Sequence, residues 1–336
     1  MAKRKRTKAN SNSKVLAYIA WSLAIVAIAL SSLLVGYYLG YDNAKSEITK
    51  SEKVDRQKRL ALLQKLEASS KKSEEEKKSV NKRLQEVLKK ETKSYISASH
   101  ELDDDTLVNP PKEPIREIKR SSNKPRLAII IDDVGTKSQV KAIKSLNLAL
   151  TMSFLPPSKF RPNTPKLASH ESNYMVHLPM EAQNFSAEEP FTLRVHDSQS
   201  IISARVAEIK KLFPKVHYIN NHTGSKFTSN EVAMNRLIFA FNANKISFVD
   251  SRTTAQTQAP KVLKNFGLNY VARDVFLDHH MDKPYILEQI KKAIVVAKSH
   301  GTAIAIGHPH KNTLQALYES KKLFKEVDLV YINRLN

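Results

Sequence analysis

Residues 126–135 read RLAIIIDDVG, an apolar run that ends in two acids and a glycine. A short aliphatic run bounded by turn-forming residues is typical of a buried strand. Successive side chains of a strand point to opposite faces, so we expect one of Asp132 and Asp133 to face inward and the other a neighbouring element. Because two acids also suit a turn or a helix cap, this stretch alone predicts a strand but no chemistry.

Seven more stretches of the chain have the same character. The candidate strands cover residues 149–155, 173–178, 216–220, 246–249, 269–272, 302–306 and 329–332. Helix-like stretches lie between them, for example residues 198–213 and 283–300. Strands that alternate with helices predict βα units and a parallel sheet, either open or closed into a barrel.

Polar residues follow six of seven successive candidate strands. In a parallel barrel the carboxyl ends of all strands open on one face, and that face holds the chemistry. Buried charges are costly unless they are paired or bind a metal. The sequence therefore predicts one site at this face, built from Asp132, Asp133, His177, Glu181, Asn220, Asn221, His222, Ser225, Asp250, Arg252, Arg273, Asp274, Asp278 and His308.

Residues 15–41 contain no charged side chain. A helix needs about 20 apolar residues to cross a bilayer, so this segment predicts a single transmembrane anchor. Residues 1–14 are basic, and the positive-inside rule then places them in the cytoplasm and the rest of the chain across the cytoplasmic (inner) membrane, in the periplasm or its equivalent. A cleaved signal peptide is the alternative, but its apolar core would be shorter.

Residues 42–98 are rich in Lys, Glu, Gln and Leu and contain neither proline nor glycine, a composition that predicts a helical stalk. The apolar residues of the stalk do not form unbroken heptads, so a coiled coil that would pair two copies stays an open alternative. Residues 99–125 change to charge, proline and serine, as in a linker, and residues 126–336 form the C-terminal domain.

Composition excludes several classes of function. The chain has no cysteine, which rules out disulfide scaffolds, thiolate metal sites and cysteine nucleophiles. Its net charge of +22 would suit a nucleic-acid binder. The excess is divided equally between residues 1–125 and 126–336, no nucleic-acid-binding motif is present, and the expected location is outside the cytoplasm. We therefore expect no nucleic-acid partner.

Six motifs in order resemble one known family: IIIDDVG, VHLPME, NNHTGSKFT, FVDSRTT, RDVFLD and AIAIGHPH. They are similar to those of the divergent polysaccharide deacetylases, a branch of the NodB-like carbohydrate esterases. The resemblance covers about residues 126–320 and implies a distorted (β/α)7 barrel. It also implies metal-dependent removal of N-acetyl groups from amino-sugar polymers.

The resemblance implies roles for four residues. Asp132 would be the general base, and Asp133 would bind a divalent metal. Arg273 would orient and ionise Asp132. His308, in the GHP motif, would be the general acid that protonates the departing amine.

The second motif departs from the family pattern. The typical deacetylase has two metal-binding histidines four residues apart, whereas here His222 is followed at that spacing by Lys226. We expect His177 to replace the missing ligand, with His308 as the next candidate. One carboxylate and two imidazoles suit zinc or another divalent ion with a preference for nitrogen and oxygen ligands.

Six more residues of the motifs are expected to bind substrate, with Asn221 or a backbone N–H near Gly224 as the donor to the oxyanion. They are Glu181, Asn221, Ser225, Asp250, Arg252 and Asp274. For a domain anchored outside the membrane, the nearest N-acetylated polymer is peptidoglycan.

Two further functions compete with the deacetylase. A catalytically weak or inactive barrel could bind a glycan or an envelope protein, and the missing second histidine favours this alternative. A glycosidase would need two carboxylates roughly 5–10 Å apart, and Asp132 with Asp250 or Glu181 could supply them.

Overall fold

The structure is a computed structural model that describes residue 21, residues 124–185 and residues 187–335. The predicted basic tail, stalk and anchor lie outside these residues, except for Trp21, which is helical. Most of the predicted linker lies outside them as well. None of the helices in the described part combines the length and the apolar character that crossing a membrane requires.

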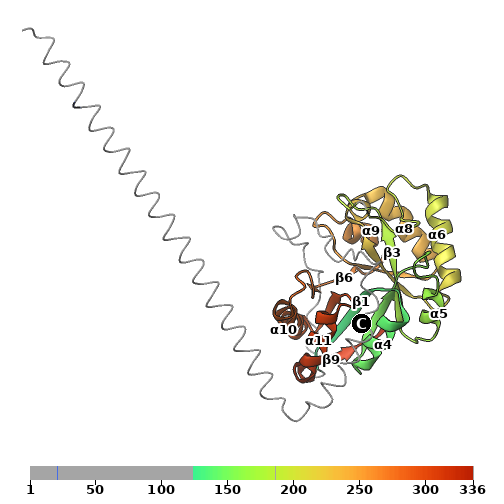
Figure 1. Cartoon of the computed structure of the whole chain (residues 1–336). Coiled ribbons are helices and arrows are strands. Elements are labelled where there is room, and N and C mark those ends of the chain that lie inside the picture. The colour runs from blue at the N-terminus through green and yellow to red at the C-terminus, as the bar shows by residue number, and fades with distance from the viewer. Residues whose placement is uncertain (1–20, 22–123, 186, 336) are drawn as a thin grey trace, which may run out of the picture. The chain divides into compact units, whose positions relative to one another are not determined.

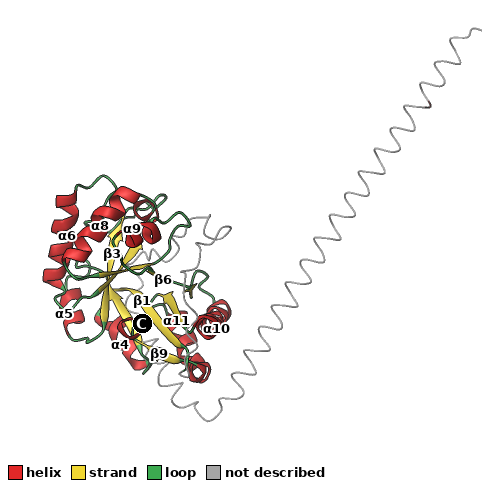
Figure 2. Cartoon of the chain, turned by 180° about the vertical axis from the view of Figure 1, so that it is seen from behind, coloured by secondary structure: helices red, strands yellow, loops and turns green. Residues whose placement is uncertain are grey.

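All strands of the described domain belong to one sheet in which every pairing is parallel, as the βα pattern predicts (Figure 2). Along the sheet the order is β6-β5-β4-β3-β2-β1-β8-β7, and β9 pairs with β1 beside this path. The eight expected strands are confirmed, and β7 is an addition. Their bounds are β1 Arg126–Val134, β2 Leu150–Phe154, β3 Tyr174–Met180, β4 Tyr218–Thr223, β5 Ser247–Asp250, β6 Val271–Ala272, β7 Val275–Phe276, β8 Thr302–Gly307 and β9 Asp328–Val330.

The two end strands of the sheet, β6 and β7, are separated in the chain only by Arg273 and Asp274. The backbone N–H of Arg273 donates to the Asp250 carbonyl on β5, and that of Asp274 donates to the Ile304 carbonyl on β8. This short segment therefore joins the two ends of a curled sheet. The arrangement is an α/β half-barrel of parallel strands, consistent with the distorted (β/α)7 barrel that the resemblance implies.

Helices cover the outer face of the sheet, with α5, α6, α8 and α9 along one part and α10 and α11 along another (Figure 1). Capping side chains begin several of them, for example Thr136 at α4 and Asp282 at α10. The expected helices 198–213 and 283–300 are confirmed as α6 and α10. The bounds are α4 Lys137–Ser145, α5 Thr164–Ser169, α6 Gln199–Leu212, α7 Ser225–Thr228, α8 Glu231–Ala243, α9 Ala259–Asn265, α10 Lys283–His300 and α11 Lys311–Glu319, with the 3-10 helices η2 Ser320–Glu326 and η3 Ile332–Arg334.

One cluster of the apolar core precedes the polar site residues along the strands. It combines residues of β1, β3, β5 and β8 with two residues from the C-terminal end of the domain. These are Ala128, Ile130, Met175, Val249, Ile304, Ile306, Ile332 and Leu335. The site therefore has a packed floor, and polar side chains in the same strands can face inward only nearer their carboxyl ends.

Candidate metal and catalytic site

A β-bulge at the end of β1 brings both acids to the same site. Ile131 pairs with Met152 and Val134 with Phe154, so β1 has one residue more than β2 between these pairs. Asp133 has φ 56°, in the left-handed region. The simple alternation expected from the sequence is wrong here, because the extra residue changes which way the second acid points. A single imidazole, that of His177, lies 3.6 Å from Asp132 and 3.5 Å from Asp133.

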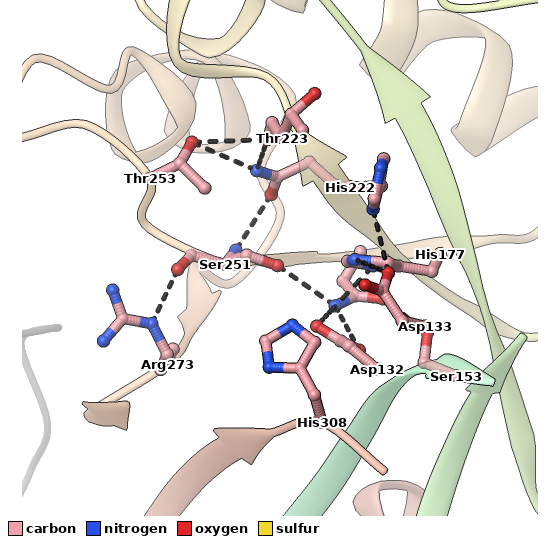
Figure 3. Close-up of polar contacts among 12 residues, drawn as sticks. Asp132, Asp133, Ser153, His177, His222, Thr223, Ser251, Thr253, Arg273 and His308 are labelled. Carbon is pink, nitrogen blue, oxygen red and sulfur yellow. Dashed lines mark hydrogen bonds and ion pairs between the residues drawn. The ribbon is translucent and has the colours of Figure 1, made fainter. Parts of the chain in front are cut away.

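Three strands supply a cluster of candidate metal ligands, Asp133 from β1, His177 from β3 and His222 from β4 (Figure 3). All three residues are buried, and one donor atom from each lies within 4.8 Å of the others. His222 Nδ1 is 2.9 Å from Asp133 Oδ1, and the two imidazole rings are 4.9 Å apart. The structure therefore brings together the three residues expected to bind a metal.

The donor set fits a divalent metal ion. Ligand bonds of about 2.0–2.1 Å in a tetrahedral site put neighbouring donors about 3.3 Å apart, close to the distances of 2.9 and 3.5 Å from Asp133 to the two imidazoles. The ring atom of His177 that faces Asp133 is Nε2, whereas Nδ1 faces Asp132 at 3.6 Å. Burial and the neighbouring His222 lower the pKa of His177 well below its usual value, so its imidazole is neutral and has a lone pair for a metal.

Asp133 is held as a carboxylate. Burial acts to raise its pKa, but the charge of His222 and its hydrogen bond, with further charge from His308 and His177, lower the pKa far below the ordinary value. Metal ligands must be deprotonated, so the environment favours the form of Asp133 that binds a cation.

Asp132 is held by an asparagine. Asn220 Nδ2 donates to both carboxylate oxygens, at 2.9 and 2.8 Å, and its Oδ1 accepts from Ser153 at 2.6 Å. Burial raises the pKa of Asp132 to about 7, against the opposing effects of His308 and the Asn220 hydrogen bond. A carboxyl group with a pKa near neutrality is suited to act as a general base.

His308 follows β8 and is oriented by Asp278. The His308 ring Nδ1 is 3.0 Å from Asp278 Oδ1, and its backbone N–H donates to Asp278 Oδ2 at 2.7 Å. Thr313 also donates to Asp278 Oδ2. Burial lowers the pKa of His308, but Asp278 and the two site acids outweigh burial and raise it to about 9. The protonated ring is therefore the stable form at neutral pH and can donate a proton.

Arg273 is not where the resemblance implied. Its Nε donates to the Ser251 carbonyl at 2.7 Å and its Nη2 to the Arg252 carbonyl at 2.9 Å, and its guanidinium lies 5.0 Å from the centre of the Phe276 ring. Asn220 makes the contacts to Asp132 that Arg273 was expected to make (Figure 3). The role assigned to Arg273 is therefore corrected: it braces the loop after β5.

The departure at Lys226 also has a structural account. Lys226 Nζ lies 2.7 Å from Glu181 Oε1, and Glu181 Oε2 accepts the backbone N–H of Val195. Charge and hydrogen bonds from Lys226 lower the pKa of Glu181 despite the effect of its burial. Glu181 thus holds Lys226 and the loop after β3, and contacts within the protein occupy both of its oxygens.

Asn221 lies between the site residues Asn220 and His222 on β4, so its side chain points to the opposite face of the strand. Its Oδ1 accepts the Ser251 N–H at 2.9 Å, and its Nδ2 donates to the Thr223 carbonyl at 2.6 Å. Asn221 therefore braces two loops, and its expected role as oxyanion donor has no support from these contacts.

The remaining expected substrate-binding residues are held by the rim loops. Asp250 accepts from Thr257, Tyr270 and the Arg252 N–H. Among the contacts of the other three, the Arg252 side chain donates to the Arg273 carbonyl, Ser225 accepts from the Gln183 N–H and Asp274 accepts from the Ile304 N–H. Contact with substrate remains a prediction for all four.

Two site residues escaped functional assignment from the sequence. Asn220 suited a turn, and Asp278 was one polar residue among several in its motif. A signal was present for Asn220, because it stands two residues before His222 on the same strand and therefore shares its face. Asp278 is 30 residues from His308, and only the fold shows that they meet.

The fold and the site together define an α/β half-barrel protein with a candidate metal centre of one carboxylate and two imidazoles. The model of the divergent polysaccharide deacetylase family matches residues 129–336, and the chain belongs to this family. The resemblance found in the six motifs is thereby confirmed.

The relatives share the C-terminal part of the chain. The uncharacterized protein YibQ of Escherichia coli K12 is 35% identical over 202 residues, which cover 58% of this chain and 61% of that protein. The chain therefore spans about three-fifths of this relative's length. An uncharacterized protein of Haemophilus influenzae is 30% identical over 213 residues, covering 62% of this chain and 76% of that protein.

A solved structure, that of the uncharacterized protein ATU2773 from Agrobacterium tumefaciens C58, has the same fold. Its TM-score is 0.55 at 16% identity, and the match covers 66% of this chain and 97% of that chain. At this identity the likeness supports the fold alone.

Proposed function

We propose that the chain is a metal-dependent hydrolase that removes N-acetyl groups from an amino-sugar polymer. The observation that carries this proposal is the convergence of Asp133, His177 and His222 from three strands. Beside them lie Asp132, whose pKa of about 7 suits a general base, and His308, whose pKa of about 9 suits a general acid. Membership of the polysaccharide deacetylase family supports the same substrate class.

The metal would be held by Asp133, His177 and His222, and zinc is the ion that this donor set suits best. A bound divalent ion would supply Lewis-acid polarisation of the acetyl carbonyl and would lower the pKa of water. The chain's own part is to keep Asp133 ionised, His177 neutral and all three side chains buried.

Asp132 and His308 would move the protons. Asp132, held by Asn220, takes a proton from the attacking water as a new C–O bond forms to the acetyl carbon. His308, oriented through Nδ1 by Asp278, gives a proton to the sugar nitrogen as the C–N bond breaks. The products are acetate and a free amino sugar, and the two residues return to their starting forms when a proton passes between them through solvent.

The proposal includes a location. Residues 15–41 would anchor the chain in the cytoplasmic membrane with residues 1–14 in the cytoplasm and the C-terminal domain outside. Peptidoglycan would then be the nearest N-acetylated polymer, and the stalk of residues 42–98 would set the reach of the domain or join two copies.

The test is the metal content of the full chain, measured by elemental mass spectrometry after excess ions are removed. We expect about one zinc or similar ion per wild-type chain and its loss in Asp133→Ala and His222→Ala, with Lys226→Ala as a control that keeps it. Deacetylation of N-acetylated oligosaccharides, followed as released acetate, should then depend on the ion.

One observation favours a second function, a binding module with little or no turnover. The histidine pair typical of the family is replaced here by His222 and Lys226, and Lys226 is paired with Glu181. A wild-type chain that retains no metal, even after zinc is added, would support this alternative and overturn the hydrolase.

A further inference from the structure

Two phenylalanines on the rim are unusually exposed. Phe160 is 78% exposed in the loop between β2 and α5, and Phe191 is 71% exposed in the loop between β3 and α6. Both loops leave the carboxyl ends of parallel strands, so they lie on the same face as the candidate site. The helices they enter, α5 and α6, lie on the same flank of the sheet (Figures 1 and 2).

A chain of contacts connects the Phe160 loop to the candidate site. Arg161, next to Phe160, is buried, and its stem lies over Gly135, where a Cβ would be only 3.0 Å from Arg161 Cδ. Gly135 is two residues beyond Asp133. The loop that carries Phe160 therefore packs directly on the bulge that forms the site.

The same arginine connects the Phe191 loop. Arg161 Nη2 forms an ion pair with Glu189, two residues before Phe191. Both partners are mostly buried, with side-chain exposures of 7% and 15%. The two loops that carry the exposed rings are therefore fastened to each other.

Phe191 is held rigidly although it is exposed. The guanidinium of the buried Arg205 lies 5.2 Å from the centre of the Phe191 ring, a cation–π contact. Arg205 Nη1 forms an ion pair with Glu208 at 2.7 Å, whereas Nε and Nη2 are buried without hydrogen-bond partners, so Glu208 and the ring are both neighbours of this cation. The aromatic ring thus has one face on the guanidinium while most of its surface faces solvent.

The backbone at Phe191 is also unusual. Its φ of 60° is in the left-handed region, which glycine adopts freely and a bulky side chain rarely does. A large apolar side chain kept at such a position, and exposed there, is a sign of function rather than of stability.

We propose that Phe160 and Phe191 form a sugar-stacking platform that binds rings of the same polymer beside the one that reacts. This inference takes its polymer from the proposed function. The sugar is favoured over a lipid surface because both loops carry charged residues near the phenylalanines in the chain, Lys159 and Arg161 in one loop and Glu188, Glu189 and Arg194 in the other. A pyranose has an apolar face for the ring and hydroxyls for these charges, whereas membrane binding needs a larger continuous apolar surface.

The test measures binding without turnover, in the full chain carrying Asp133→Ala. Calorimetry would compare hexa-N-acetylchitohexaose and soluble peptidoglycan fragments with the monosaccharide N-acetylglucosamine. We expect Phe160→Ala and Phe191→Ala each to weaken binding of at least one long ligand by about threefold to tenfold and to leave the monosaccharide unchanged. Phe239→Ala on α8, also an exposed phenylalanine, should have no effect.

Two more variants separate binding from folding. Phe191→Gly relieves the backbone conformation, so its Tm should not fall although its binding does. Phe191→Trp keeps an aromatic ring and should restore binding of the long ligand. Equal binding of long ligands by the wild-type and both alanine variants, or no binding of either long ligand, would overturn the platform.

The test distinguishes failure of the platform from failure of the proposed function. Phenylalanine-dependent binding by the Asp133→Ala chain, together with no acetate release by the metal-loaded wild-type chain, would support the platform and reject the hydrolase. If the chain with Asp133 intact releases acetate from long ligands, and Phe160→Ala and Phe191→Ala leave its KM unchanged, the hydrolase would be supported and the platform rejected. Phenylalanine-dependent binding to phosphatidylglycerol vesicles, without sugar binding, would show a lipid surface instead and overturn the sugar platform.

Discussion

The lower and upper interior of the curled sheet come from the same strands but have opposite chemistry. An apolar cluster fills one part of this interior, and in β1, β3 and β8 the residue two positions further along the chain belongs to the candidate site. Residues two apart in a strand share a face, so a core residue and a site residue can follow each other on the inner face of one strand. The pairs are Ile130 and Asp132, Met175 and His177, and Ile306 and His308.

The comparison shows how the domain divides stability from function. The lower layer has no polar group to satisfy and contributes burial. The upper layer buries acids and imidazoles, which is costly for folding, and the shifted pKa values that result are useful for chemistry. Changes in one layer should therefore leave the property supplied by the other layer largely intact.

The largest effect is expected for Asp132→Asn in the upper layer. This change keeps the size of the side chain but removes the general base, so acetate release should fall by about 10²–10⁴-fold. Metal content should not change, because Asp132 is not one of the three ligands. Turnover and elemental analysis on the same sample check this, and loss of the metal would show that Asp132 is a ligand instead.

Ile130→Ala tests the lower layer. Removing a fully buried aliphatic side chain should lower the free energy of unfolding by about 2–5 kcal/mol, measured by denaturant titration. The folded fraction should still bind its metal as the wild-type chain does. A variant that keeps its stability but loses the metal would contradict the division between layers.

Asp278→Asn should reduce acetate release by about 10²-fold, because the orientation and charge of His308 depend on this carboxylate. The pKa of His308 is about 9 in the folded protein, above its ordinary value of about 6.5. Its contribution to stability is therefore fully present below about pH 6.5 and lost as the pH rises through about 9.

The stability gap between the wild-type and Asp278→Asn chains should thus be wide at pH 6 and narrower at pH 10. The alkaline limb of the activity profile should move to lower pH in the variant. Urea titrations at the two pH values and the pH dependence of acetate release provide the measurements. A difference in unfolding free energy that is the same at both pH values would show that Asp278 does not act through the ionisation of His308.

The smallest effect is expected for Lys226→Met. Its ion pair with Glu181 is partly exposed, so the free energy of unfolding should change by less than about 1 kcal/mol. Metal content should stay the same, since Lys226 is paired with Glu181 and is not one of the three candidate ligands. A marked loss of metal would show that the Glu181 pair positions His222.

The positions of eight strands along the chain could be predicted from the sequence, because each strand is a short run rich in apolar residues that must be buried. Strand β7 could not, since two residues show no periodicity. His177 could be expected at the site because the resemblance left one metal ligand missing and His177 lies in another strand. The opposite direction of Asn221 follows from alternation with His222, but the directions of Asp133 and Arg273 could not be predicted, because a bulge and two backbone carbonyls decide them.

The first strand of the domain also has a mechanical consequence. From Arg126 onward β1 pairs with β8 on one edge and with β9 and then β2 on the other. A force applied to the chain at residue 125 and directed along the strand would load the hydrogen bonds of both edges together, in shear. Detaching β1 would then require many bonds to break at once, so the domain should resist tension from a tether on that side.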